Sequence, residues 1–525
     1  MQIFSFSPFG YEGAIVAVEV DLRRGIPSVD IVGLADGAVK ESRERMKSAI
    51  QNSGFTFPLE RVLISLSPAD LKKEGAGFDL ALALAILNAS SDSKDDDDTK
   101  TEEFTCKIQG EPVLVMGELE LSGTIRPVKA VHAAAATAAA AGIYKCIVAS
   151  ANASEAREVE GMKVFGASNL SQAVEAMRSP ELFTGGDEKE SLPEGCVKIN
   201  GIAFPPEDKA LEFADIKGQH NLVRGLQIAA AGGHNLLAFG PPGCGKTLSL
   251  QRFPALLPLL TPEEAQTVTR IYSLAGLLSQ NQSLIRQPPF RIPHQTASIE
   301  GICGGGTNCR PGEISLAHGG VLFLDEAAEF KTSVLQMLRV PLECGSITLS
   351  RAGRSTTYPA NFQLLMATNP CPCGNFGVSG KICLCSARSV EQYWRKFSGP
   401  LLDRVDIRTA VLTQDSDDEK NLSTAELRKK IATAVRIQRK RQGKRNAQLT
   451  PQEILEFCQL GKDEQDFLNK SIKKLDFSQR AVSGILKLSR TIADMEDSQK
   501  IKCEFIKEAI AFRKNVGPLD LFNGE

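Results

Sequence analysis

The segment NLLAFGPPGCGKTLSL, residues 235–250, constrains the fold more than any other part of the sequence. An apolar run typical of a buried strand leads directly into a glycine-rich loop, and a helical pattern follows. Backbone N–H groups of such a loop can curl around phosphates when the loop joins a strand to the start of a helix. The segment therefore predicts an α/β domain with a mostly parallel sheet and a nucleotide at the end of this strand.

The loop itself supplies the predicted contacts with ATP. Lys246 would neutralise the charge of the β- and γ-phosphates, and the hydroxyl of Thr247 would bind Mg²⁺. The alternative is a glycine-rich turn with a chance lysine, and the strand-to-helix context argues against it. The predicted nucleotide-binding residues are Gly240, Pro241, Pro242, Gly243, Cys244, Gly245, Lys246 and Thr247.

An acidic pair follows a second apolar strand in GVLFLDEAAEF. Asp325 would hold Mg²⁺ through water, and Glu326 would orient and polarise the attacking water. Such a pair is common at strand ends, but its position after the phosphate loop predicts hydrolysis in addition to binding. Asn369 ends the apolar strand FQLLMAT and is predicted to bind the γ-phosphate or the water; an ordinary polar strand cap is the alternative.

Two arginines fit a hydrolase whose site is completed at a subunit boundary. Arg404, in GPLLDRVDI, is predicted to reach a neighbouring subunit's nucleotide and to neutralise charge in the transition state. A salt bridge with Asp403 or Asp406 is the alternative for this side chain. Arg480, at the start of the helical pattern RAVSGILKLSR, is a candidate nucleotide sensor, and Arg490 competes with it for that role.

Length and composition limit the class of protein. A chain of 525 residues is long enough for two or three domains, and its formal net charge of -2 gives no global attraction for nucleic acid. No run of about 18 apolar residues is present, and the start MQIFSFSPFGYEG lacks a basic segment before an apolar one. A cytoplasmic protein without membrane insertion is predicted, and scattered single cysteines fit a reducing compartment.

Periodicity divides the chain into four parts. Residues 1–178 mix strand and helix patterns, 179–206 read as an exposed linker, 207–413 alternate strands with helices, and 414–525 are helical with no convincing strand. Within the first part, the acidic run SSDSKDDDDTKTEE is predicted to be a disordered surface insert, because it cannot bury apolar surface.

Four motifs carry a resemblance to a known family: GPPGCGKT, RPGEISLAHGGVLFLDEAAEF, MATNPCPCG and GPLLDRVDI. In this order they resemble the magnesium-chelatase-like branch of the AAA+ ATPases. With the first domain and the helical tail included, nearly the whole chain resembles the ComM/YifB family. That resemblance implies a hexameric ring with ATP between subunits, and a helicase that drives DNA branch migration during recombination in competent cells.

The N-terminal part is similar to the Lon-type protease fold but departs from the enzyme. By this resemblance the serine position falls near Gly77 and the lysine position near His132. A Ser-Lys dyad needs a hydroxyl nucleophile in contact with an amine base, and neither residue supplies one. Lys129 is close in sequence but has no serine partner in the glycine-rich segment. A binding or assembly module without protease activity is therefore predicted.

A hairpin with basic residues is the predicted contact with DNA. The segment CGSITLSRAGRSTTYPANFQ alternates and turns at about Ala352-Gly353, with Arg351 and Arg354 at the tip. An ordinary solvated hairpin would also carry arginine there. Arg310, in a glycine-rich loop, is a further candidate. Without aromatic residues between the basic ones, binding to branched or single-stranded DNA would be independent of sequence.

A second group of basic residues lies on a helical pattern near the start of the tail. A solvated helix face and a phosphate contact are equally good interpretations of it. The group comprises Arg436, Arg439, Lys440, Arg441, Lys444 and Arg445.

Two Cys-x-Cys pairs follow Asn369 in NPCPCGNFGVSGKICLC. Four thiolates are enough for a closed tetrahedral Zn²⁺ site, although this spacing is tighter than usual. Free thiols or a redox role are the alternatives. The four candidate ligands are Cys371, Cys373, Cys383 and Cys385.

Two other classes of function compete with a DNA motor. One is a chelatase-type motor subunit that acts on a protein or drives metal insertion into a porphyrin. The appended Lon-like domain and fused helical tail favour the DNA motor over it. The other is a scaffold without catalysis, and the intact acidic pair Asp325-Glu326 argues against that interpretation.

Overall fold

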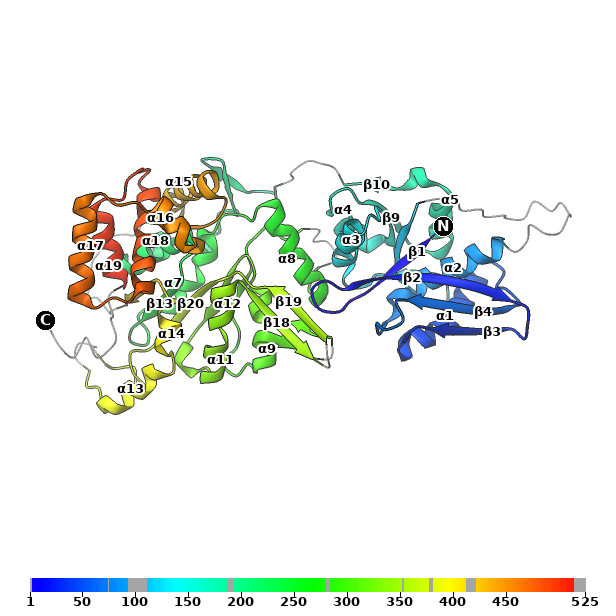
Figure 1. The fold of residues 1–525 in the computed structure, drawn as a ribbon, viewed down its shortest axis with the longest axis horizontal. Coiled ribbons are helices and arrows are strands. Elements are labelled where there is room, and N and C mark those ends of the chain that lie inside the picture. The colour runs from blue at the N-terminus through cyan, green and yellow to red at the C-terminus, as the bar shows by residue number, and fades with distance from the viewer. Residues whose placement is uncertain are drawn as a thin grey trace.

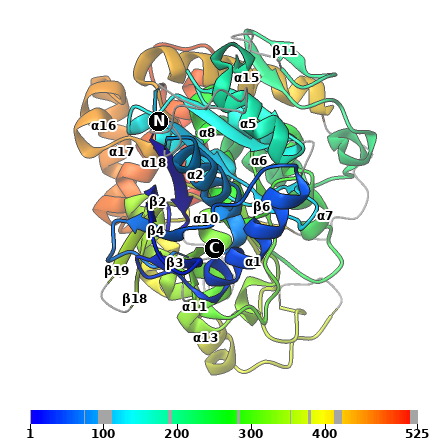
Figure 2. The same cartoon turned by 90° about the vertical axis from the view of Figure 1, so that its right-hand side faces the viewer.

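The computed structural model describes residues 2–73, 75–92, 111–186, 192–279, 284–306, 308–351, 354–376, 381–411 and 422–513. Residues 93–103 of the acidic run and the hairpin tip at 352–353 lie outside the described residues. The N-terminal sheet lies at one end of an elongated molecule, the C-terminal helices lie at the other, and a second sheet lies between them (Figure 1). Viewed from its N-terminal end, the molecule presents strands of the first sheet toward the reader (Figure 2).

The N-terminal part is an eight-stranded mixed sheet in the order β10-β9-β8-β5-β1-β2-β4-β3. Its strands are β1 (Ile3–Ser7), β2 (Ala14–Arg23), β3 (Ser28–Val32), β4 (Arg61–Ser67), β5 (Val113–Met116), β8 (Lys145–Ala149), β9 (Lys163–Ala167) and β10 (Thr184–Gly185). Alternating burial along β4 places Val62, Ile64 and Leu66 in the core. A short ladder pairs β6 (Glu118–Leu119) with β7 (Ile125–Arg126).

Helices bury apolar side chains on both faces of this sheet. One core contains Met46, Leu82 and Ala173, and the other contains Val131 and Ala156. The predicted α/β character of this region is confirmed. The helices are α1 (Gly37–Asn52), α2 (Asp79–Asp92), α3 (Val131–Ala140), α4 (Ala153–Arg157) and α5 (Leu170–Arg178).

The segment predicted as an exposed linker is partly ordered into strands. β10 extends the first sheet by pairing with β9, while β11 (Val197–Ile199) and β12 (Ile202–Phe204) form a separate ladder. Phe204 is fully buried, and the guanidinium of Arg428 lies 5.4 Å from its ring centroid. The apolar alternation of IAF explains the ordering, because burying Phe204 stabilises a segment that polar residues flank.

The second sheet has five parallel strands in the order β14-β17-β20-β13-β21. Because all strands are parallel, their carboxyl ends meet at one edge, where loops after β13, β17 and β20 converge. The strands are β13 (Leu236–Phe239), β14 (Phe290–Arg291), β17 (Val321–Leu324), β20 (Gln363–Thr368) and β21 (Ile407–Ala410).

Helices and two short ladders surround the second sheet. The ladders are β15 (Gly304–Gly305) with β16 (Arg310–Pro311), and β18 (Ser346–Arg351) with β19 (Arg354–Pro359). The helices are α6 (His220–Gly232), α7 (Lys246–Gln251), α8 (Pro262–Ala275), α9 (Ile299–Cys303), α10 (Glu313–Leu316), α11 (Thr332–Met337), α12 (Arg339–Cys344), α13 (Ala387–Arg395) and α14 (Gly399–Leu402). The predicted parallel sheet with helices is confirmed.

The tail folds as helices within residues 422–513, as predicted. Ser423 caps the first helix and forms a capping box with Glu426. Apolar residues of the tail share a core with α6, including Ile431 and Leu488. The helices are α15 (Thr424–Gln442), α16 (Pro451–Phe457), α17 (Lys462–Leu475), α18 (Gln479–Met495) and α19 (Cys503–Arg513).

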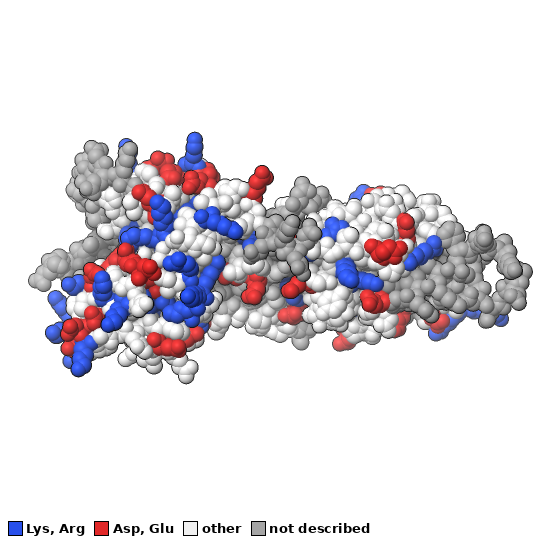
Figure 3. All heavy atoms as spheres, turned by 90° about the horizontal axis from the view of Figure 1, so that it is seen from above, with Lys and Arg blue, Asp and Glu red and all other residues white. Residues whose placement is uncertain are grey.

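Surface charge is mixed on the face seen in Figure 3. Lysine and arginine side chains alternate there with aspartate and glutamate, without one continuous basic field. This pattern agrees with a formal net charge of -2. None of the described helices is both long and apolar enough to cross a membrane.

Candidate functional site

The phosphate loop joins β13 to α7 at the carboxyl edge of the second sheet. A Cβ atom added at Gly240 would lie 2.0 Å from the carbonyl oxygen of Val411, so only glycine fits there. Gly245 caps α7 with φ 85°, in the left-handed region. Lys246 is the first residue of α7, and its Nζ donates to the carbonyl oxygens of Gly240 and Pro241, each at 2.7 Å.

Lys246 also approaches the end of the neighbouring strand β20. Its Nζ lies 3.4 Å from Oδ1 of Asn369. Burial lowers the pKa of Lys246, and Cys244 and Asp325 act in the opposite direction. The predicted phosphate-binding amine and the predicted γ-phosphate contact are therefore adjacent.

Thr247 meets the acidic pair that follows β17. Its Oγ1 donates a hydrogen bond to Oδ1 of Asp325 at 3.0 Å, so the Thr247 hydroxyl and the Asp325 carboxylate lie side by side. Such oxygen donors, together with phosphate oxygens, fit the ligand preference of Mg²⁺. Glu326 is exposed and has φ 47°, and its carboxylate accepts a hydrogen bond from Nε2 of Gln295. Sequence reasoning missed Gln295, because no recognised spacing links it to Glu326.

Arg404 and Arg480 converge on one carboxylate, that of Glu343 on α12. Arg480 donates to Oε1 of Glu343 at 2.7 Å, and Arg404 donates to Oε2. The side chains of Arg404, Arg480 and Glu343 are 9%, 45% and 51% exposed. The hydrogen bonds that Arg404 and Arg480 donate lower the pKa of Glu343, and the bond from Arg404 contributes most.

Arg404 forms an ion pair, as the alternative interpretation expected, but among the described residues its carboxylate partner is Glu343, not Asp403 or Asp406. Asp406 binds Nδ1 of His234 at 3.0 Å and lies 3.3 Å from Arg513. Asp406 immediately precedes β21, and the backbone there directs its side chain toward α18 and α19. The local sequence around Asp406 contains no residue of these helices, so its partners could not be predicted from it. Glu343 was missed for the same reason: it lies far from both arginines along the chain.

Arg490, the competing candidate for nucleotide sensing, is part of the helical core. It is buried, pairs with Asp494 at 3.0 Å and donates to the carbonyl oxygen of Gln499 at 2.8 Å. Its guanidinium is therefore committed to the structure of the tail, while Arg480 remains half exposed at the start of α18.

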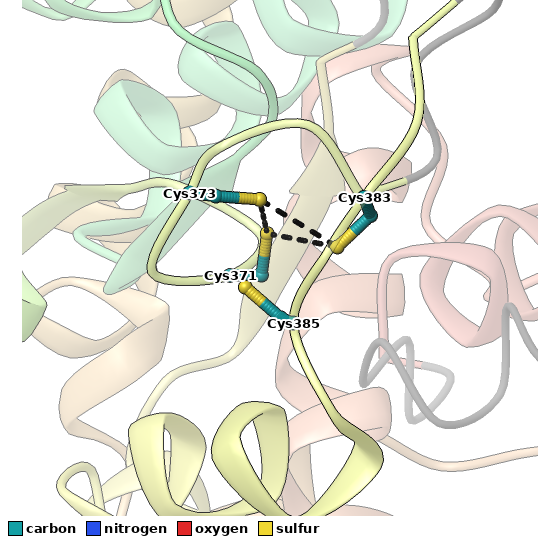
Figure 4. Close-up of side chains that lie close together, drawn as sticks. All are labelled: Cys371, Cys373, Cys383 and Cys385. Carbon is teal, nitrogen blue, oxygen red and sulfur yellow. Dashed lines mark hydrogen bonds between the residues drawn. The ribbon is translucent and has the colours of Figure 1, made fainter.

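The four cysteines after β20 bring their sulfur atoms together (Figure 4). All four Sγ atoms lie within 4.8 Å of one another, with Cys371 to Cys373 at 3.4 Å and Cys371 to Cys383 at 3.7 Å. A tetrahedral zinc site with Zn–S bonds of about 2.3 Å would have S···S edges of about 3.8 Å. The group including Cys385 therefore fits zinc, whereas a disulfide needs about 2.05 Å.

The cysteine loop packs directly against the phosphate loop. A Cβ added at Gly374 would lie 2.8 Å from Cδ of Pro242. On the other side, Nε1 of Trp394 donates to the carbonyl oxygen of Pro370 at 3.0 Å. A ligand that fixes the cysteines would thus also fix the chain that follows Asn369.

Comparison with known proteins identifies the family. Residues 212–419 match the family model described as magnesium chelatase, subunit ChlI, and residues 421–513 match the C-terminal model of that subunit. Residues 18–152 match a third model, subunit ChlI of Mg-chelatase.

Among relatives, the competence protein ComM of Haemophilus influenzae is 40% identical over 522 residues, which cover 98% of this chain and 97% of that protein. The chain belongs to the ComM/YifB family. YifB of Escherichia coli is 39% identical over 511 residues, covering 96% of this chain and 95% of YifB. The magnesium-chelatase 38 kDa subunit of Rhodobacter capsulatus is 28% identical over 176 residues, 30% of this chain and 50% of that subunit. The ComM/YifB chain is accordingly a magnesium-chelatase-like AAA+ ATPase.

In this ComM/YifB chain, the two positions compared with a protease dyad have other surroundings. His132 is buried on α3, and its Nε2 lies 2.7 Å from Oε1 of Gln266 on α8. Burial lowers the pKa of His132 to about 4, so the ring is neutral at pH 7. The backbone of Gly77 lies near Val128: a Cβ added at Gly77 would lie 4.0 Å from Cγ1 of Val128. Lys129 packs its aliphatic stem over Gly276.

The predicted hairpin is present as β18–β19, outside the five-stranded sheet. Its strands pair in register up to Arg351 opposite Arg354, and the Thr348 and Thr357 hydroxyls lie 3.0 Å apart. Arg351 is exposed, as is Arg310 at the start of β16, and the Arg354 side chain lies outside the described residues.

Four of the six basic residues of the ComM/YifB tail are partly buried and bond to other groups of the chain, so they are neither a fully solvated helix face nor free for phosphate. Arg441 forms two bonds with Asp494, at 2.8 and 2.9 Å, and Arg445 donates to the carbonyl oxygen of Ala230 at 2.7 Å. Lys444 pairs with Glu453, and Arg439 is directed to the carbonyl oxygen of Leu259. Arg436 and Lys440 are the exposed members of the group.

Proposed function

We propose that the chain is an ATP-dependent DNA motor that promotes branch migration of recombination intermediates during DNA integration in natural transformation. The observation that carries the proposal is the nucleotide site: Thr247 joins Asp325 and Lys246 joins Asn369 at one sheet edge. The full-length likeness to the competence protein ComM supports DNA as the substrate.

In the proposed hydrolysis, each residue of the sheet edge has one task. Backbone N–H groups of the loop and Lys246 hold the phosphates. Thr247 and Asp325 would hold Mg²⁺, which neutralises phosphate charge. Glu326 accepts a hydrogen bond from the attacking water, Gln295 holds that carboxylate in position, and Asn369 orients the γ-phosphate.

The proposed assembly is a homohexameric ring with ATP between subunits. Arg404 and Arg480 would act on the neighbouring subunit's nucleotide, where a guanidinium neutralises transition-state charge. Their shared partner Glu343 supports this proposal, because one half-exposed carboxylate holds the largely buried Arg404 beside the half-exposed Arg480.

The remaining parts of the chain have supporting roles in this proposal. Residues 1–178 would be a Lon-like module without protease activity, 179–206 a connection, 207–413 the AAA+ motor and 414–525 its helical domain. Arg351 and Arg354 would contact DNA phosphates without reading sequence. Zinc held by the four cysteines would be structural. A cytoplasmic location is supported by the cysteines of the described chain, which form no disulfides.

A chelatase-type motor that acts on a protein or a metal-porphyrin substrate is the second candidate. The observation that favours it is the match of three segments to magnesium-chelatase models. The two candidates differ in their response to DNA, since only a DNA motor couples its hydrolysis to a DNA junction.

The deciding measurement is the ATPase rate of the purified chain without DNA, with linear duplex and with a four-way junction. We expect stimulation by the junction. Lys246→Ala should lower the ATPase rate by about 10²–10³-fold, because the substitution removes the charge that faces the phosphates. Glu326→Gln should lower the ATPase rate by a similar factor and should still bind ATP, because Glu326 acts on the attacking water.

A rate indifferent to every DNA would overturn the DNA motor and favour the chelatase-type candidate. Full hydrolysis in Glu326→Gln would remove the role assigned to that carboxylate.

A further inference from the structure

The turn between β1 and β2, residues 8–13, reaches across to the hairpin β18–β19 (Figure 1). The backbone N–H of Tyr11 donates to Oγ1 of Thr356 on β19 at 2.9 Å. The rings of Tyr11 and Tyr358 meet edge to face, with centroids 5.8 Å apart. A Cβ added at Gly10 would lie 2.1 Å from the same Thr356 hydroxyl. The turn and the second hairpin strand are therefore in close contact.

The same turn also touches the glycine-rich loop that carries Arg310. The backbone N–H of Gly10 is directed to the carbonyl oxygen of Asn308 at 3.4 Å. That loop packs on the hairpin, since a Cβ added at Gly304 would lie 3.1 Å from Cδ1 of Leu349. One N-terminal turn thus contacts both segments that the sequence predicts to face DNA.

Helix α8 fixes the turn from behind. Arg270 donates to the carbonyl oxygens of Tyr11 at 3.2 Å and Glu12 at 3.1 Å, and its guanidinium lies 4.6 Å from the Tyr11 ring centroid. Oγ1 of Thr137, on α3, donates to the same Glu12 carbonyl at 3.0 Å. The turn is therefore held by α8 and α3 in addition to its contact with the hairpin.

The hairpin needs such support, because an isolated two-stranded ladder is marginally stable in water. Among the described strands, β18 and β19 pair only with each other. Its described strand residues include three buried side chains, Ile347, Thr356 and Tyr358, whereas Arg351 next to the tip is exposed. Two of these three buried side chains, Thr356 and Tyr358, contact Tyr11.

We propose that the β1–β2 turn is a brace, with Tyr11 as a positioning residue that holds the hairpin β18–β19 at the angle needed for contact with DNA. The N-terminal module then acts on the motor through the hairpin and takes no part in ATP chemistry. The link to DNA rests on the proposed function, whereas the brace itself is a property of the folded chain.

The test compares the full-length wild type with Tyr11→Ala and Tyr11→Phe. Amide hydrogen exchange is measured at residues 346–351 and 354–358, and ATPase is measured with and without the four-way junction. In Tyr11→Ala we expect roughly tenfold faster exchange in the hairpin. The junction-stimulated part of the rate should fall by about threefold or more, while the DNA-free rate stays within about twofold. Tyr11→Phe keeps the ring and should behave as wild type.

Tyr144→Ala is the matched control, because Tyr144 is an exposed tyrosine of the same N-terminal part, 51% exposed, outside this contact. Thr356→Val is a second variant that removes only the acceptor on the hairpin, and it should reproduce part of the effect. It keeps the test valid if Tyr11→Ala does not fold.

Each outcome decides one part of the proposal. Hairpin exchange in Tyr11→Ala and Thr356→Val equal to that of Tyr144→Ala would overturn the brace. Faster exchange with an unchanged junction response would overturn the positioning for DNA. If the wild type ignores DNA, the proposed function fails, and hydrogen exchange still decides whether the turn braces the hairpin.

Discussion

The nucleotide edge of the second sheet and the Glu343 cluster, which consists of Glu343, Arg404 and Arg480, both join residues that are far apart in sequence. Only the nucleotide edge could be predicted from the sequence. At the nucleotide edge, Lys246, Thr247, Asp325 and Asn369 each follow a strand or start the next helix. At the other site, Glu343 pairs with Arg404 from the turn after α14 and with Arg480 from the start of α18. Backbone topology arranges the first site, and side-chain packing between helices arranges the second.

The strand order explains this difference. β20 lies between β13 and β17, so Asn369 falls between the phosphate loop and Asp325 whatever the surrounding side chains are. No comparable rule links α12 to the start of α18. Arg404 and Arg480 were both predicted to act on nucleotide, but their common carboxylate could only be found in three dimensions.

The largest expected effect tests whether the second site works across a subunit boundary. Arg404→Ala should lower ATPase by about 10³-fold, as for other arginines that complete a neighbour's site. Lys246→Ala should be similarly inactive because its own nucleotide site fails. Mixing the two inactive variants in equal amounts should restore activity to about one quarter of wild type, since in a ring about one quarter of sites then pair an intact loop with an intact Arg404.

A mixture as inactive as its components, with subunit exchange demonstrated, would mean that Arg404 serves its own subunit. The comparison between the two sites would then change, because the Glu343 cluster would belong to the same catalytic centre as the sheet edge.

Much of the fold could be predicted because its patterns are local. The parallel strands, the N-terminal α/β region and the helical tail all follow from periodicity that the structure preserves. The linker departed from prediction because Phe204 gains stability from a distant partner, Arg428. The basic tail residues departed for the same reason: Arg441 and Arg445 find acceptors in Asp494 and Ala230, which no short window of sequence contains.

The cysteine loop could be predicted only in part. The spacing of its cysteines predicts four metal ligands, but it does not predict that the loop packs against the nucleotide edge. Cys373→Ser should abolish bound zinc and lower ATPase by about tenfold, since the loop that packs on Pro242 loses its fixed shape. Zinc is measured by elemental mass spectrometry, and ATPase is measured on the same preparation.

Cys344→Ser is the control for that experiment, because Cys344 is an exposed free cysteine outside the cluster. Equal zinc content in the two variants, or a wild type that carries no zinc after purification in its presence, would contradict a metal site and leave free thiols as the better interpretation.

The smallest expected effect concerns Glu343 itself. Glu343→Gln removes the charge shared by Arg404 and Arg480. Although the Arg404 side chain is only 9% exposed, the carboxylate of Glu343 is 51% exposed, so stability should change by less than about 1 kcal/mol. Arg404 keeps a bond from Nη1 to the carbonyl oxygen of Pro400 at 2.6 Å, and we therefore expect kcat to fall by only about threefold, with KM for ATP unchanged. Glu391→Gln, at another exposed ion pair, is the matched control. A rate above wild type would mean that Glu343 competes with phosphate for the arginines, and the cluster would then restrain hydrolysis where we expect it to support it.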